Sequence, residues 1–315
     1  MAHRRDLAIS APSRFGIGLL RPILIGILIL VIVSIIVLGA AGGFFTLRII
    51  TEHNEIENVS PQNFLLNNYE SLSFTDPSGG EHDGWLLRGL KGAPAIILCP
   101  GYDSNRSDQL SLGAVLQENH FNVYIFNFRG PKTRHSISDL GVRQAGEVQA
   151  AITWIVKQPG INPHRVGLFG PTSGGYAALV AAEGNPLVKA IAVDSTYEKP
   201  IQMFDAQLDQ LLGGPSTFFR FLAEIEFSLV NLGTKIPPVR ENLSKLANIP
   251  KLFISGRDTP SLASITEDLY NAAPQPKTLR EFEHSQSAQA SGAERKEYEN
   301  QILSFFLQNL PLRAD

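Results

Sequence analysis

The sequence is poor in the residues that build covalent or metal-based frameworks. Cys99 is the only cysteine among 315 residues, which excludes an intramolecular disulfide and a cysteine-based metal site. Apart from His284, the histidines lack metal-ligand spacing, and no H-E-x-x-H, P-loop or dinucleotide fingerprint occurs. The sequence therefore predicts neither a bound metal nor a cofactor.

Charge is missing from one long segment near the start of the chain. Residues Pro22–Leu47 are uncharged and rich in Ile, Leu and Val. About 20 such residues cross a bilayer, and a buried helix of a soluble protein is rarely apolar all round. Gly39, Ala40 and Ala41 could form a signal-peptide cleavage site, but the apolar region of a signal peptide has only about 7–15 residues. We therefore predict a retained transmembrane anchor over residues 22–47.

The charges that flank this segment predict its orientation. Residues 1–48 hold five arginines against the single acid Asp6, so the overall net charge of −3 leaves −7 for the rest of the chain. Four of these arginines precede the apolar segment, and the positive-inside rule places such a basic segment, residues 1–21, in the cytoplasm and the main body outside it. An acidic body gives no attraction to phosphate backbones, so we do not expect a nucleic-acid partner. Gly39 and Gly43 have the small-xxx-small spacing that occurs where membrane helices dimerise. The same glycines are also tolerated in single membrane helices, so the oligomeric state stays open.

Beyond a polar linker at residues 48–67, short apolar runs alternate with helical patterns. Several runs are closely followed by Gly or Pro, as in strands buried on both faces. In residues 141–158, apolar side chains recur with helical spacing. This alternation predicts an α/β fold with a mainly parallel sheet and helices on both faces. The predicted strands are Tyr69–Phe74, Gly84–Arg88, Ala95–Leu98, Phe121–Phe126, Arg165–Phe169, Val188–Val193, Lys251–Ile254 and Thr278–Phe282.

One stretch interrupts the alternation. Residues 197–248 show no clear strand pattern, and they predict a helical insertion or lid over the carboxyl edge of the sheet, where ligands bind in open α/β sheets. Within it, residues 218–232 are strongly apolar. We expect most of the aromatic residues there to pack in the core, and whether the segment covers a site stays open. These aromatic residues are Phe218, Phe219, Phe221 and Phe227.

The stretch Gly170-Pro-Thr172-Ser-Gly174 lies between an apolar strand and a predicted helix, and this is the context of a G-x-S-x-G nucleophile elbow. The loop Leu98–Arg106, the triplet Phe128–Gly130 and the segment Ile254–Asp258 accompany it. Together these segments resemble the α/β-hydrolase superfamily, in its dienelactone-hydrolase and prolyl-oligopeptidase-like branch. The resemblance covers about residues 68–310 and implies an α/β-hydrolase domain at residues 68–315, in a group composed mostly of esterases, lipases and peptidases.

The resemblance also implies a set of site residues. In the family order of nucleophile, acid and histidine, these positions fall on Thr172, Asp258 and His284. The acid would hold the imidazole while the histidine takes the hydroxyl proton. Backbone N–H groups of Tyr102 and Ser173 would form the oxyanion hole. Arg106 is expected to anchor its loop, and Glu147 is expected to make a structural pair with Arg129.

The sequence departs from the family pattern at the nucleophile, where Thr172 stands in place of serine. A threonine hydroxyl can act as a nucleophile, but an elbow holds its nucleophile at positive φ, which a β-branched residue tolerates badly. Ser173 is the alternative hydroxyl, although Pro171 would then replace the first glycine of the motif. The primary hypothesis is therefore a membrane-anchored hydrolase of small-molecule or lipid-like acyl esters or amides. A catalytically inactive membrane-tethered binding module and an acyltransferase remain the alternatives.

Overall fold

The computed structural model describes residues 15–51, 57, 59–128, 139–237, 239–286 and 288–313, with side chains from Arg21 onward. An eight-stranded sheet forms the centre of the body, with strand order β1-β2-β4-β3-β5-β6-β7-β8. β1 and β2 pair antiparallel with each other, β2 pairs antiparallel with β4, and the other neighbours are parallel. The predicted α/β class and all eight predicted strands are confirmed. The strands are β1 (Tyr69–Thr75), β2 (Glu81–Leu87), β3 (Ala95–Leu98), β4 (Asn122–Phe126), β5 (Val166–Pro171), β6 (Val188–Asp194), β7 (Lys251–Gly256) and β8 (Lys277–Phe282).

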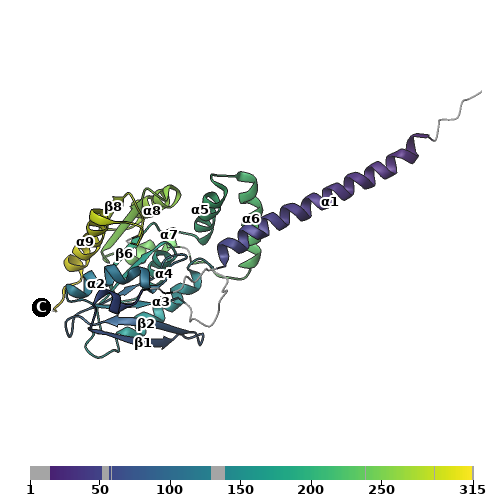
Figure 1. The fold of residues 1–315 in the computed structure, drawn as a ribbon. Helices are drawn as coiled ribbons and strands as arrows, with labels where there is room; N and C mark the ends of the chain where they lie inside the picture. Colours follow the sequence, from purple (N-terminus) through teal and green to yellow (C-terminus); the bar gives the residue numbers. More distant parts are fainter. Residues whose placement is uncertain are drawn as a thin grey trace, which may run out of the picture.

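Helices cover both faces of the sheet, as predicted (Figure 1). The central strands β3, β4, β5 and β7 are buried over their whole length, because apolar side chains from both faces meet a helix layer. One core cluster joins the sheet to α3 (Val142–Ile155), α4 (Thr172–Ala182) and α8 (Pro260–Ala272). The other cluster joins it to α2 (Leu110–Glu118) and α9 (Gly292–Asn309). The described chain also contains four short helical segments: η1 (Pro61–Phe64), η2 (Arg106–Gln109), α7 (Val239–Asn242) and η3 (Leu243–Leu246).

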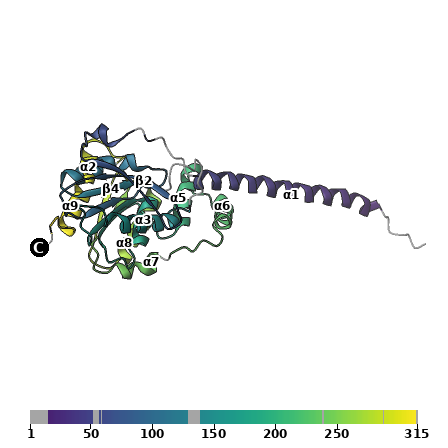
Figure 2. The same cartoon turned by 90° about the horizontal axis from the view of Figure 1, so that it is seen from below.

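A single long helix, α1 (Phe15–Ile50), projects away from this body (Figures 1 and 2). Its segment Arg21–Ile50 is long and apolar enough to cross a membrane. The helix continues three residues past Leu47, where the predicted anchor ends, and its last residues Ile49 and Ile50 are buried in the core of the body. The end of α1 is therefore packed into the body.

The insertion between β6 and β7 consists of α5 (Pro200–Leu212) and α6 (Thr217–Val230), followed by the short segments α7 and η3. The expectation that most of its aromatic residues are core is wrong. Phe227 is buried, but the side chains of Phe218 and Phe221 are 51% and 61% exposed. The reason is that α6 packs against α5 and the end of α1 through one face only, and its opposite face is uncovered.

Candidate active site

The predicted elbow is present at the junction of β5 and α4. β5 ends at Pro171, and α4 begins at Thr172 with no loop between them. Thr172 has a φ of 44°, in the left-handed region that the elbow was predicted to require. Such a backbone in a β-branched residue costs about 1–3 kcal/mol and persists only where the surroundings enforce it. The surroundings of this turn are tightly packed, because a Cβ at Gly174 would collide with the carbonyl oxygens of Pro100 and Cys99.

The loop after β3 lies directly against the hydroxyl of Thr172. The backbone N–H of Tyr102 donates a hydrogen bond to Thr172 Oγ1 over 2.8 Å. A Cβ on Gly101 would stand 2.8 Å from the same oxygen, so only glycine allows this approach. Ser173 lies in the first turn of α4, where backbone N–H groups have no acceptor within the helix. The structure thus brings Thr172, Tyr102 and Ser173 together. The Tyr102 N–H, one of the two predicted oxyanion donors, is hydrogen-bonded to the Thr172 hydroxyl oxygen.

Tyr102 also connects this loop to the long N-terminal helix. Its phenol O–H donates to the backbone carbonyl of Ile49 over 2.8 Å. One residue therefore binds the candidate nucleophile through its backbone and the end of α1 through its side chain. The candidate site consequently lies one tyrosine side chain away from the end of α1.

His284 follows β8, where the predicted base was expected, but its ring has a different partner. Its Nδ1 lies 2.8 Å from the carboxylate of Glu294, and its backbone N–H donates to the same carboxylate over 3.0 Å. The hydrogen bond and the charge of Glu294 raise the pKa of His284. The ring is 49% exposed. Among the described residues, no hydrogen bond joins His284 to Thr172 or Asp258.

Asp258 is hydrogen-bonded to Ser285, the residue that follows His284. Its carboxylate accepts the backbone N–H of Ser285 over 2.8 Å and the Ser285 hydroxyl over 3.1 Å. Ser285 is fully buried, whereas His284 is not. Asp258 therefore ties the loop after β7 to the loop after β8, and its carboxylate is one residue away from the ring that it was predicted to orient.

Sequence reasoning missed two acidic residues near this edge of the sheet. Glu294 is the fourth residue of a Ser291-x-x-Glu294 pattern, which marks a helix start but does not reveal the contact with His284. Asp194 ends the buried strand β6, beside the elbow strand β5. It accepts hydrogen bonds from the Tyr298 hydroxyl over 2.6 Å and from the Gln286 backbone over 2.7 Å. Burial raises the pKa of Asp194 to about 6.

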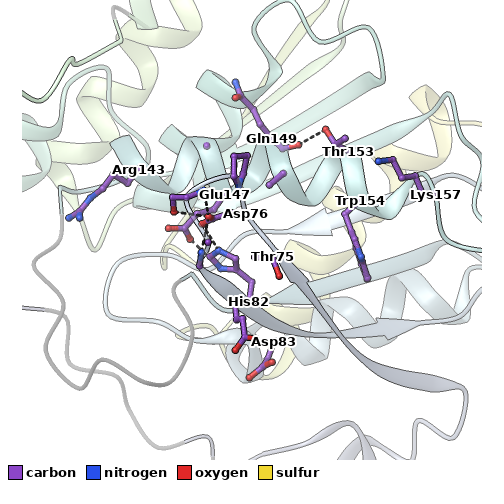
Figure 3. Close-up of a pocket in the computed structure, with 17 residues that line it drawn as sticks. Thr75, Asp76, His82, Asp83, Arg143, Glu147, Gln149, Thr153, Trp154 and Lys157 are labelled. Carbon is purple, nitrogen blue, oxygen red and sulfur yellow. Dashed lines mark hydrogen bonds and ion pairs between the residues drawn. The ribbon is translucent and has the colours of Figure 1, made fainter.

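A second polar cluster lies in a surface hollow between the β1–β2 hairpin and α3 (Figure 3). His82 Nε2 is 2.9 Å from Asp76, and its Nδ1 is 3.5 Å from Glu147. These residue types could bind a cation, but both ring nitrogens already face carboxylates, so a metal would have to displace one of these contacts. The cluster connects the hairpin to α3, and none of the predicted site residues lines the hollow.

The predicted structural arginine is observed in its expected role. The Arg106 guanidinium stacks over the Trp85 ring at 4.0 Å and pairs with Glu57 at 2.8 Å, which anchors the loop after β3. Arg129, the expected partner of Glu147, lies outside the described residues.

No protein-family model matches the chain. Among curated proteins, it is 29% identical over 220 residues to the uncharacterized protein YfhR of Escherichia coli (strain K12), a match that covers 67% of this chain and 70% of YfhR. It is also 28% identical over 123 residues to the polyketide transferase grgF of Penicillium sp, covering 38% of this chain and 42% of that protein.

Comparison with solved structures identifies the fold. The esterase Pf2001 of Pyrococcus furiosus superposes with a TM-score of 0.66 at 16% identity, covering 83% of this chain and 98% of the esterase. A dienelactone hydrolase of Anabaena variabilis superposes with a TM-score of 0.56 at 18% identity, covering 78% and 100% of the two chains. The chain therefore has the α/β-hydrolase fold.

Proposed function

We propose that this chain is a membrane-anchored hydrolase that cleaves an ester or amide acyl group through Thr172. The observation that carries the proposal is the elbow: Thr172 stands at positive φ between β5 and α4, with Oγ1 bonded to the backbone N–H of Tyr102. Enforced backbone strain at a sharp strand-to-helix turn serves to present a side chain, and it is costly in a turn that only connects elements.

The proposed reaction uses Oγ1 of Thr172 as the nucleophile and His284 as the base that the family order assigns. The Thr172 oxygen would attack the acyl carbonyl carbon while His284 accepts the hydroxyl proton. The N–H groups of Tyr102 and Ser173 would stabilise the negative charge on the former carbonyl oxygen. His284 would return its proton to the departing alcohol or amine. A water molecule, deprotonated by His284, would then attack the acyl-threonine and release the acid.

This sequence of steps requires one rearrangement. His284 must leave Glu294, place Nδ1 against Asp258 and turn Nε2 toward Thr172. Asp258 already accepts two hydrogen bonds from Ser285, so the residue next to His284 is held at this carboxylate. The negative charge of Asp258 also contributes to the raised pKa of His284.

The similar proteins support acyl chemistry and leave the substrate to be identified. Their names include an esterase, a dienelactone hydrolase and a polyketide transferase. We infer that α1 is a single membrane span, with residues 1–21 in the cytoplasm and the body outside it, from the arginines that precede the span.

A catalytically inactive, membrane-tethered binding module is the second candidate. Two observations favour it: the elbow residue carries an additional methyl group, and the ring of His284 is held by Glu294. In that case the hydroxyl of Thr172 would serve only to close the loop after β3 onto the elbow.

Labelling with a charged, membrane-impermeant fluorophosphonate tests both the function and the topology. The full chain should be used, because Ile49 and Ile50 are part of the core. We expect labelling of intact cells that express the wild-type chain and none with Thr172→Ala. Labelling that occurs only after cell lysis would contradict the topology. A label that persists in Thr172→Ala and is lost in Ser173→Ala would contradict the choice of nucleophile.

The contact between His284 and Glu294 predicts the pH dependence of hydrolysis. His284 must be neutral to act as the general base, and Glu294 raises its pKa. The hydrolysis rate should therefore fall on acidification with a midpoint above the ordinary histidine pKa of 6.5. Glu294→Gln removes the negative charge, so we expect the limb to move to lower pH with no decrease in the plateau rate. The matched variant Asp258→Asn should lower the plateau. If Glu294→Gln lowers the plateau and Asp258→Asn does not, Glu294 is the residue that orients the ring.

A further inference from the structure

The outward face of α6 has the wrong polarity for a helix surrounded by water. Five large apolar residues recur on it at spacings of three and four, and their exposed fractions run from 44% to 82%. A water-facing helix normally carries polar residues at these positions. We call this set the outer stripe: Phe218, Phe221, Ile225, Leu229 and, just beyond the helix end, Leu232.

The charged residues of α6 point toward the protein instead. Arg220 makes an ion pair with Asp209 of α5 at 2.6 Å. Glu226 accepts a hydrogen bond from Thr46 of α1 over 3.3 Å, and a Cβ on Gly42 would stand 2.9 Å from the same carboxylate. The polar side of α6 is thus used for internal contacts and its apolar side faces outward, which is the arrangement expected next to lipid.

The outer stripe is continuous with the exposed surface of α1. Ring contacts run from Phe44 to Phe45 at 5.6 Å, from Phe45 to Phe219 at 5.9 Å, and from Phe219 to Phe218 at 5.6 Å. Phe44 itself is 64% exposed. Figure 1 shows α6 crossing α1 near the end that enters the body, and Figure 2 shows it beside that end.

The position of this crossing along α1 corresponds to the surface of a bilayer. The hydrocarbon core takes up about 20 helical residues, and counted from Pro22 these end near Ala41. Gly42, the next residue, is the one that packs against Glu226. An apolar helix face that crosses a membrane span at this level lies at the boundary between headgroups and acyl chains.

The candidate active site is connected to α1 at Ile49, seven residues or about 10 Å of helix beyond this boundary. The Tyr102 side chain connects the last turn of α1 to the loop that holds Thr172, through the contacts with Ile49 O and Thr172 Oγ1. An acyl ester that sits in the leaflet at this boundary would therefore lie next to the end of α1, which Tyr102 connects to Thr172, whereas a substrate dissolved in water gains nothing from an apolar stripe.

We propose that the outer stripe of α6 is inserted in the same bilayer that holds α1, and that the site takes long-chain acyl esters carried by that bilayer. The substrate half of this proposal rests on the hydrolase function proposed above. The insertion half rests on the membrane span proposed for α1 and on the packing of α6 against it.

The insertion is tested by spin labels on the full chain in vesicles of palmitoyl-oleoyl phosphatidylcholine. Cys99 is buried, so labels can be placed at introduced cysteines, Phe221→Cys and Leu229→Cys. The matched control is Leu307→Cys, an exposed leucine on α9, at the opposite end of the body from α1 (Figure 1). We expect the labels on α6 to be more accessible to oxygen than to a water-soluble nickel complex, and the label at residue 307 to show the reverse.

Two results would overturn the insertion. Preferential access of the nickel complex to both α6 labels would show that the stripe faces water. Spin–spin broadening at residue 221 that disappears on dilution with unlabelled chain, without an oxygen preference, would show that a second copy covers the stripe.

The substrate class is tested with the double variant Phe221→Asp/Ile225→Asp. Charges in an apolar boundary disfavour insertion, so we expect hydrolysis of dioleoylglycerol embedded in the vesicles to fall at least about tenfold. Hydrolysis of water-soluble p-nitrophenyl butyrate should be unchanged. Equal losses on both substrates, or no loss on dioleoylglycerol, would overturn the proposed substrate class. A wild-type chain inactive on both would refute the hydrolase function and the substrate half together, while the spin labels still decide the insertion.

Discussion

Thr172→Ser is expected to raise turnover of small activated esters by roughly tenfold to a hundredfold, the range that corresponds to relief of about 1–3 kcal/mol. A threonine side chain is restricted at χ1. Here its hydroxyl oxygen accepts a hydrogen bond from the Tyr102 N–H, which is a predicted oxyanion donor. Serine lacks the methyl group, so its oxygen can rotate toward His284 and leave that N–H for the substrate. The measurement is p-nitrophenyl butyrate hydrolysis by the full chain in detergent.

Thr172→Val is the matched control, because it keeps the branched shape and removes only the hydroxyl. Thr172→Val and Thr172→Ala should both abolish hydrolysis, and His284→Ala should do so in parallel, since the members of a triad act as a unit. A folded Thr172→Ser chain with no activity above Thr172→Ala would favour the binding module. Wild-type activity in Thr172→Ala with loss in Ser173→Ala would move the nucleophile to Ser173.

Gly174→Ala should destabilise the chain by about 1–3 kcal/mol or more, because overpacking against fixed atoms cannot be relieved by a side-chain rotation. The added methyl would meet the carbonyl oxygens of Pro100 and Cys99 (2.7 Å for the latter), both in the backbone of the loop that carries Tyr102. Displacement of that loop removes an oxyanion donor, so any hydrolysis should fall on the order of a hundredfold. Thermal unfolding and esterase rates of the same sample would measure both effects.

Gly146→Ala provides the control for this prediction. Gly146 lies within α3, and a Cβ there would have no other atom within 4 Å. Alanine favours the helix over glycine, so this variant should gain roughly 0.5–1 kcal/mol of stability and keep its activity. If Gly174→Ala were as stable as Gly146→Ala, the loop after β3 would not be packed against the elbow as the structure has it.

The strands and the elbow could be predicted because their causes are local. A short apolar run forms a buried strand wherever helices cover both of its faces, as Ala95–Leu98 and Val188–Val193 illustrate. Glycine at positions 170 and 174 indicates that another part of the backbone approaches closely there, without specifying which part. The predicted positive φ at Thr172 follows from the same pattern and is observed.

The partners of the site residues could not be predicted, since they are selected by which loops meet at the sheet edge. His284 follows β8 as expected, but whether its ring meets Asp258 or Glu294 depends on how α9 begins relative to β8. The exposed face of α6 could not be predicted either. Phe218 and Phe227 are equally apolar in sequence, and only packing on α5 and α1 buries one and exposes the other.

The sequence by itself determined the long apolar segment, the order of the strands along the chain and the elbow with threonine at its centre, because each depends on side chains that are neighbours in the chain. Only the tertiary structure decided that Ile49 is core, that Tyr102 joins the end of α1 to Thr172, and that α6 turns its charged side inward. These contacts link residues far apart in the chain, and the free energy that selects them comes from burial and hydrogen bonding, which no local pattern records.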